Sequence, residues 1–188
     1  MKSGFEVLKN KEIIEILDGD KVFGEYIDTM NTYGNSKKIE VCMPYLSGPN
    51  IRDISKLFGL NQSSLEGISR WQYFDRLLDY CIDRQKTSDF LTYLFAKERF
   101  VDKLRGLPPE KIDEVHTRIV QEIIQQINSI LYFGNNELCL TETNYVIRAV
   151  GTSINIDTPS VKIIDRYTLK ISRKEQSKKL TMDILIVQ

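Results

Sequence analysis

The sequence predicts an α+β protein with a mainly helical core that is followed by a small antiparallel β-sheet. Three observations support this class. Apolar residues recur at helical spacing in four segments between residues 49 and 133. After residue 136 the pattern changes to alternating apolar and polar residues, which is typical of strands with one buried face. Hydrophobic residues make up 41% of the 188-residue chain, enough for a substantial core.

The first 41 residues are predicted to form an N-terminal extension in front of this core. Isoleucines and a leucine within residues 13–17 indicate a short helix that ends near Gly19. The polar run at residues 31–38 indicates a turn, and the β-branched run at 38–43 indicates a strand. Prolines and a glycine then interrupt the chain at residues 44–49 and separate the extension from the helices.

The helical core is predicted to span residues 42–136, and its first two helices have clear start signals. Pro49 suits the first turn of a helix, where its missing N–H costs no hydrogen bond, and Gly59 suits the residue that ends it. Ser69 and Gln72 form a capping box at the start of the second helix, which is predicted to reach about residue 85.

Two longer helices complete the predicted core. One begins at Thr87 or Ser88 and continues to Gly106. The other begins at Pro108-Pro109 and ends before residues 134–136. Its apolar stripe is so wide that we expect this last helix to be central and buried on two sides.

Residues 137–188 are predicted to form a small β-rich segment packed on the core, within one globular unit. Alternation over residues 137–151, interrupted by Glu-Thr-Asn, indicates a hairpin. Short β-rich pieces around Thr158-Pro159 are expected to extend this sheet to about residue 165. Residues 180–187 also alternate and have a strand pattern.

Charge and cysteine content exclude several classes of protein. Lysine plus arginine and aspartate plus glutamate are equal at 26 each, so no global field attracts nucleic acid. The three cysteines are far apart and form no CxxC pair, which argues against a disulfide scaffold or a zinc site. No signal-like or membrane-spanning apolar run is present. We expect a cytoplasmic protein with no metal, no cofactor and no membrane partner.

No catalytic motif is visible, and the chain is predicted not to be an enzyme. His116 is the single histidine, so a two-histidine metal site is excluded, and we expect it at the surface or rim of the long helix. Asp75, Asp79 and Asp83 form a row on one helix, which we interpret as a solvated face neutralised by nearby arginines. A cryptic ribonuclease that uses His116 remains as an alternative.

A nucleic-acid-binding module is a second alternative. A helix-turn-helix is disfavoured because about ten residues separate Phe58 from Ser69, too many for its short turn. Trp71 continues an apolar stripe, so we expect it in the core rather than in a stacking surface. The candidate phosphate-binding residues are basic side chains of the second and third predicted helices: Arg70, Arg76, Arg99, Lys103 and Arg105, with Lys97 beside them.

Three motifs of the core resemble the N-terminal region of bacterial abortive-infection (Abi) family proteins, which defend against phage. They are PYLSGP at residues 44–49, SRWQY at 69–73 and INSILYFGNNEL at 127–138. The resemblance covers roughly residues 42–172. It implies that ribonuclease chemistry belongs to a C-terminal HEPN-like domain of such proteins. The arginine that precedes the histidine in HEPN motifs is absent before His116.

The resemblance implies a non-catalytic sensing or interaction module of a phage-defence system. Its partner would be a protein, namely a phage component, a host component or a second copy of the chain. Residues 173–188 depart from the family pattern. Two explanations stay open: a truncated homologue of a longer effector, or a module that acts alone.

Overall fold

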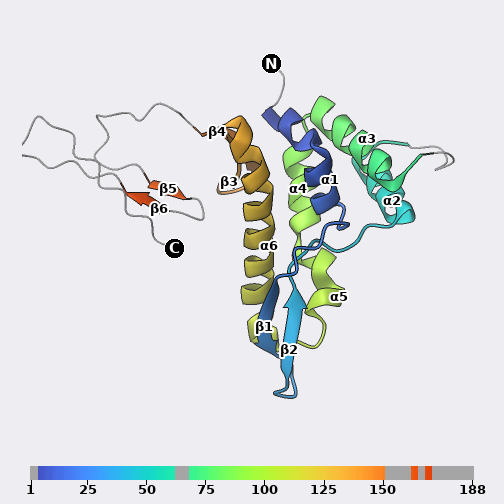
Figure 1. The fold of residues 1–188 in the computed structure, drawn as a ribbon. Helices are drawn as coiled ribbons and strands as arrows, with labels where there is room; N and C mark the ends of the chain where they lie inside the picture. The colour runs from blue at the N-terminus through green and yellow to red at the C-terminus, as the bar shows by residue number, and fades with distance from the viewer. Residues whose placement is uncertain (1–3, 62–67, 151–161, 165–167, 171–188) are drawn as a thin grey trace, which may run out of the picture. The chain divides into compact units, whose positions relative to one another are not determined.

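The computed structural model describes residues 4–61 and 68–150 together with two short strands, residues 162–164 and 168–170. The predicted class is confirmed, because helices build the core and antiparallel hairpins accompany them (Figure 1). The chain divides into two units, Met1–Val150 and Gly151–Gln188. In the first unit, the long helix α6 lies beside the other helices (Figure 1).

The N-terminal residues are part of the core rather than an extension in front of it. The elements are η1 (Gly4–Lys9), α1 (Lys11–Leu17), β1 (Tyr26–Met30) and β2 (Ser36–Glu40). Leu8, Ile13 and Leu17 are fully buried in the same cluster as the later helices. Both η1 and α1 contact α3, and α1 also contacts α6, so these N-terminal elements belong to the same packed body.

The central helices follow the predicted order, with one difference. They are α2 (Gly48–Phe58), α3 (Arg70–Asp83), α4 (Thr87–Phe95), η2 (Lys97–Phe100), α5 (Val101–Leu104), α6 (Pro109–Leu131) and η3 (Tyr132–Gly134). The helix predicted from residue 87 to 106 is broken at Ala96, which has an extended backbone with ψ 140°. The carbonyl of Phe95 lies 2.9 Å from His116 Nε2, so a side chain of α6 satisfies a carbonyl freed by the break.

Helix α6 supplies the longest buried row of the core. Val115, Ile119, Ile123, Ile127 and Leu131 repeat every four residues and are all buried. Half-buried apolar side chains flank this row and widen the stripe. The prediction of burial on two sides is therefore too strong, because the flanking residues keep part of their surface exposed.

The β-structure in the described residues consists of separate two-stranded hairpins rather than one sheet. β3 (Asn136–Leu140) pairs with β4 (Tyr145–Ala149), which confirms the hairpin predicted at residues 137–151. The side chain of Asn128 anchors it to α6 by exchanging two hydrogen bonds with the backbone of Leu138, of 2.7 and 3.0 Å. β5 (Lys162–Ile164) pairs antiparallel with β6 (Thr168–Lys170). The strand predicted at residues 180–187 lies outside the described residues.

None of the helices in the described residues combines the length and the apolar composition that crossing a bilayer requires.

Candidate functional site

Arg70, the first of the predicted phosphate-binding residues, is mostly buried and is paired with acidic residues of the N-terminal segment. Its guanidinium lies 3.1 Å from Asp18 Oδ2 and 2.7 Å from Asp20 Oδ1, and it packs 4.4 Å above the ring of Tyr45. It also donates to the carbonyls of Asp18 and Leu46, both at 3.1 Å. The charge is balanced by two carboxylates, so Arg70 has a structural role and its charge is not available to a phosphate.

The other basic candidates are distributed over different elements and are mostly engaged as well. Arg99 packs on the ring of Tyr93, Lys103 donates to the carbonyl of Glu40, and Arg105 forms a 2.6 Å ion pair with Asp102. Lys97 is paired in the same way with Asp113 at 2.6 Å. Arg76 is exposed on α3, and no ion pair involves it among the described residues.

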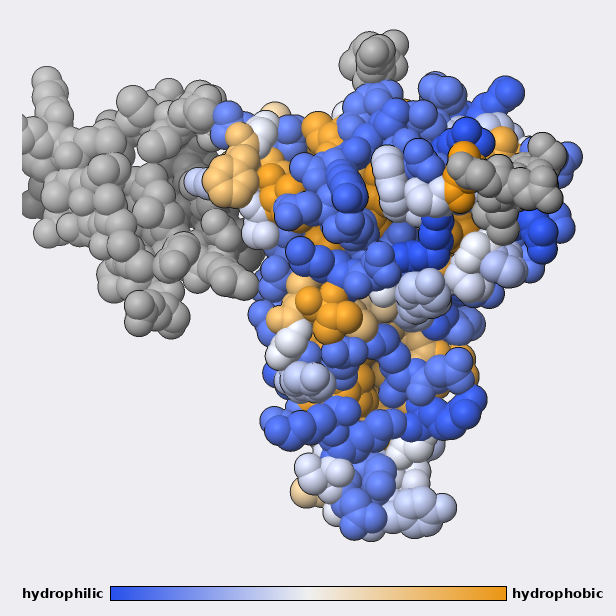
Figure 2. All heavy atoms as spheres, turned by 45° about the vertical axis from the view of Figure 1, so that its right-hand side comes forward, coloured by the Kyte–Doolittle hydropathy of each residue, from blue (hydrophilic) through white to orange (hydrophobic). Residues whose placement is uncertain are grey.

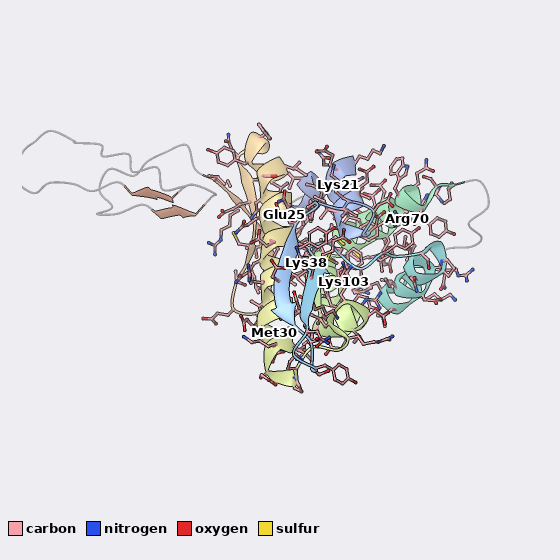
Figure 3. All side chains as sticks on the ribbon, turned by 60° about the horizontal axis from the view of Figure 1, so that its bottom comes forward. Lys21, Glu25, Met30, Lys38, Arg70 and Lys103 are labelled. Atoms are coloured by element: carbon pink, nitrogen blue, oxygen red, sulfur yellow. The ribbon has the colours of Figure 1, made fainter. Side chains whose placement is uncertain are left out.

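The basic candidates fall on two segments, Arg70 and Arg76 on α3 and the other three on η2, α5 and the residue that follows it. Figure 3 shows Arg70 on α3 well separated from Lys103 on α5. Because phosphate binding needs clustered and uncommitted cations, this arrangement offers little support for the nucleic-acid alternative.

The residues considered for catalysis are also accounted for by local packing. His116 is half-buried, and its ring meets that of Phe100 edge-on with the centroids 5.0 Å apart. In the aspartate row, Asp79 pairs with Lys9 of η1 at 2.5 Å, a partner that the sequence pattern did not suggest. Within the described ranges, no cluster of histidine, cysteine or carboxylate side chains could hold a metal ion.

A different feature emerges at the hairpin formed by β1 and β2. The N–H of Val41 donates to Glu25, and the N–H of Asn31 donates to Asn35, so the odd-numbered residues of β1 face β2 in the ladder. The backbone groups of Tyr26, Asp28 and Met30 must then point away from β2. No backbone hydrogen bond to another described residue uses these outward groups.

The opposite edge of the hairpin, along β2, is covered. Lys103 Nζ lies 3.2 Å from the carbonyl of Glu40 and 2.9 Å from the sulfur of Cys42. Lys37 of β2 in turn donates to the carbonyl of Arg105, the residue that follows α5. These contacts attach β2 to the α5 region, whereas no described residue pairs with the outer edge of β1.

A groove lies between the edge of β1 and the first turns of α6. We call it the β1 groove, and its volume is about 470 Å³. At this end of the molecule, apolar atoms are visible in recesses between hydrophilic side chains (Figure 2). The lining combines apolar side chains with charged ones: Ile27, Asp28, Thr29, Met30, Ser36, Pro108, Glu110, Lys111, Glu114, Val115 and Arg118.

The charges of the β1 groove are arranged along one face of α6. Glu110, Glu114 and Arg118 are spaced four residues apart, so they lie one above the other on the helix. Glu114 pairs with Lys111 at 2.7 Å. Glu110 and Arg118 are exposed, and neither makes an ion pair with another described residue. Two opposite charges are therefore available to a bound molecule.

A smaller cavity of about 330 Å³ lies on the other side of the corner between α5 and α6. Val101, Leu104, Leu107 and Ile112 line it, with charged side chains at its mouth. It has no unpaired strand edge, so it lacks the backbone groups that distinguish the β1 groove.

The β1 groove is not predicted from the sequence, because no strand is predicted at residues 26–30. The sequence does contain a strand signal, since Ile27 and Thr29 are β-branched, lie on either side of the polar Asp28 and precede the turn at 31–38. A hairpin turn at residues 31–38 requires a strand on each side of it, so it would place a strand before residue 31.

Comparisons of the chain with protein-family models, with curated proteins and with solved structures gave no match. The interpretation of the β1 groove therefore rests on its own geometry.

Proposed function

We propose that this chain is a non-catalytic interaction module that binds an extended segment of a partner protein along β1. The observation that carries the proposal is the edge of β1, which no described strand pairs with, next to a groove lined by apolar and charged side chains. An added strand gains hydrogen bonds to the outward groups of Asp28 and Met30, and the groove receives its alternate side chains.

The charge of the groove favours a protein segment over a nucleic acid. Asp28, Glu110 and Glu114 bring three carboxylates to the lining, against two cations, Lys111 and Arg118. A phosphate backbone entering the groove would meet net negative charge at close range, which is repulsive. A polypeptide has a neutral backbone and can carry charges of both signs, so it can match this lining.

A second copy of the chain is a poorer occupant than a different protein. Antiparallel pairing of two β1 strands over their full length would put Asp28 opposite Asp28 of the second copy. Like charges directly opposite each other destabilise a strand pair. We therefore propose a hetero-partner, and the motifs that resemble abortive-infection proteins support a phage or host protein as that partner.

The test is a pair of proline substitutions on the hairpin. Asp28 and Lys38 are cross-strand partners with outward N–H groups, so Asp28→Pro and Lys38→Pro spare the β1–β2 ladder and remove the same 3.9 Å ion pair. Asp28→Pro alone removes a donor at the groove. Peptides that bind the whole chain are first selected from a random 12-residue display library. We expect Asp28→Pro to weaken the binding of these peptides about tenfold or more, and Lys38→Pro to weaken it less than about twofold.

Hydrogen exchange of the unaltered protein supplies an independent readout. Selected peptides should slow exchange at the amides of Asp28 and Met30 but not at that of Lys38. Peptides that protect another surface, or that lose equal affinity to both proline variants, would show that the β1 edge is not the binding site.

A further inference from the structure

The two walls of the β1 groove are β1 and α6, which run antiparallel to each other. At the tip of the hairpin, the N–H of Thr32 donates to the carbonyl of Gly106, just before α6 begins. At the start of β1, Gln126 lies 3.4 Å from the carboxylate of Glu25. Figures 1 and 3 show the same arrangement, with the hairpin tip beside the first turn of α6.

The charges of the groove follow this direction. Glu110 and Glu114 lie toward the hairpin tip, and Arg118 lies toward the start of β1. Between them, Val115 is buried and provides an apolar position in the lining. The wall of the groove formed by α6 is thus acidic at one end, where Lys111 is already paired with Glu114, apolar in the middle and basic at the other end.

The spacing of these charges matches the spacing of side chains on a strand. Glu110 and Arg118 are eight residues apart, which is about 12 Å along a helix at 1.5 Å per residue. Four residues of a strand span about 13 Å, and residues 1, 3 and 5 of the strand share one face. Ile27 and Ile39 are buried, so the hairpin face that an added strand would continue is directed into the protein.

We infer that the partner segment runs antiparallel to β1 and carries a basic, an apolar and an acidic residue at alternate positions, in N-to-C order. This inference rests on the proposed function. Antiparallel addition continues the pairing already made with β2 and is slightly more stable per residue than parallel addition. It brings the basic residue to Glu110 and Glu114, the apolar residue to Val115, and the acidic residue to Arg118.

Two heptapeptides of identical composition test the inference. TKTVTET has the inferred order, and TETVTKT is the same sequence reversed. Both are acetylated and amidated, and binding to the whole chain is followed by backbone amide shifts of residues 26–30. In the inferred orientation, TKTVTET makes two exposed ion pairs with the groove, whereas TETVTKT places like charges at the same two positions. We therefore expect TKTVTET to bind about 5- to 20-fold more tightly at low salt. The preference should shrink at about 0.5 M NaCl because the charges are then screened.

A charge exchange on the protein supplies the matched control. In the double variant Glu110→Lys, Arg118→Glu, the preference should reverse toward TETVTKT, while the Lys111–Glu114 ion pair stays intact. Equal binding of the two peptides, or a preference for TETVTKT by the unaltered protein, overturns the inferred order but leaves strand addition standing. If neither peptide shifts the amides of Asp28 and Met30, the proposed function is contradicted together with the inference.

Discussion

Replacing Gly19 by alanine is expected to destabilise the protein by more than about 3 kcal/mol, which is a large part of the stability of a typical domain. Gly19 has φ +80°, and a Cβ built there would lie 2.5 Å from the carbonyl oxygen of Pro44 and 2.7 Å from the Cα of Tyr45. These are backbone atoms, so no side-chain rotation relieves the overlap. The hydrogen bond of 2.9 Å from Leu46 N–H to the Asp18 carbonyl holds the two segments together and would be strained as they separate.

Gly24→Ala separates the steric clash from the cost of the left-handed backbone. Gly24 has φ +72°, and no atom beyond its own residue and its two chain neighbours lies within 4 Å of a Cβ placed there. It should therefore lose only about 1 kcal/mol, the cost of placing a Cβ in that conformation. Urea unfolding followed by circular dichroism compares the two variants. Equal losses for Gly19→Ala and Gly24→Ala would mean that the approach of Pro44 is not tight.

Local signals in the sequence predicted local structure well. The capping box at Ser69 is present, with Gln72 Oε1 accepting from the Ser69 N–H at 2.8 Å. Gly59 ends α2 in a left-handed conformation with φ 95°, as its position suggested. Each of these interactions joins residues within one helical turn, so the sequence contains both partners side by side.

Interactions between distant segments were not predictable in the same way. The sequence marked Gly19 as the end of a helix but gave no sign that the backbone of Pro44 would pack against it. Arg70 is a phosphate-binding candidate in the nucleic-acid alternative, and no feature near it in the sequence reveals its partners Asp18 and Asp20, some fifty residues earlier. The β1 groove likewise depends on two segments about eighty residues apart, whose approach is decided by packing.

Replacing Arg70 by methionine is expected to cost about 3–5 kcal/mol at pH 7.5, because it leaves the carboxylate of Asp18 buried without its compensating charge. Asp18 has no exposed surface. Its Oδ1 accepts from the Asp20 N–H at 3.0 Å, whereas its Oδ2 has the Arg70 ion pair but no aligned hydrogen bond. Burial raises the pKa of Asp18 to about 6, although the charge of Arg70 opposes this rise.

The free energy of unfolding that Arg70→Met removes should increase as the pH rises. A carboxyl whose folded-state pKa is raised from 3.8 to about 6 stabilises the fold when it is protonated, and this contribution is lost as the pH rises from about 4 through 6. Removing Arg70 raises the pKa of Asp18 further, so the carboxyl of the variant stays protonated to higher pH. The free energy lost by Arg70→Met should therefore be smaller at pH 5 than at pH 7.5.

Adding Asp18→Asn to Arg70→Met tests whether the stability lost by Arg70→Met comes from the buried charge of Asp18. The double variant has no buried charge, so it should recover most of the stability lost at pH 7.5, and its unfolding free energy should depend less on pH between 5 and 7.5 than that of Arg70→Met. Urea unfolding at both pH values measures this for the four proteins of the cycle. A loss that is the same at pH 5 and pH 7.5 and is not recovered by Asp18→Asn would assign the role of Arg70 to its contacts with Tyr45 and the carbonyl of Leu46 instead.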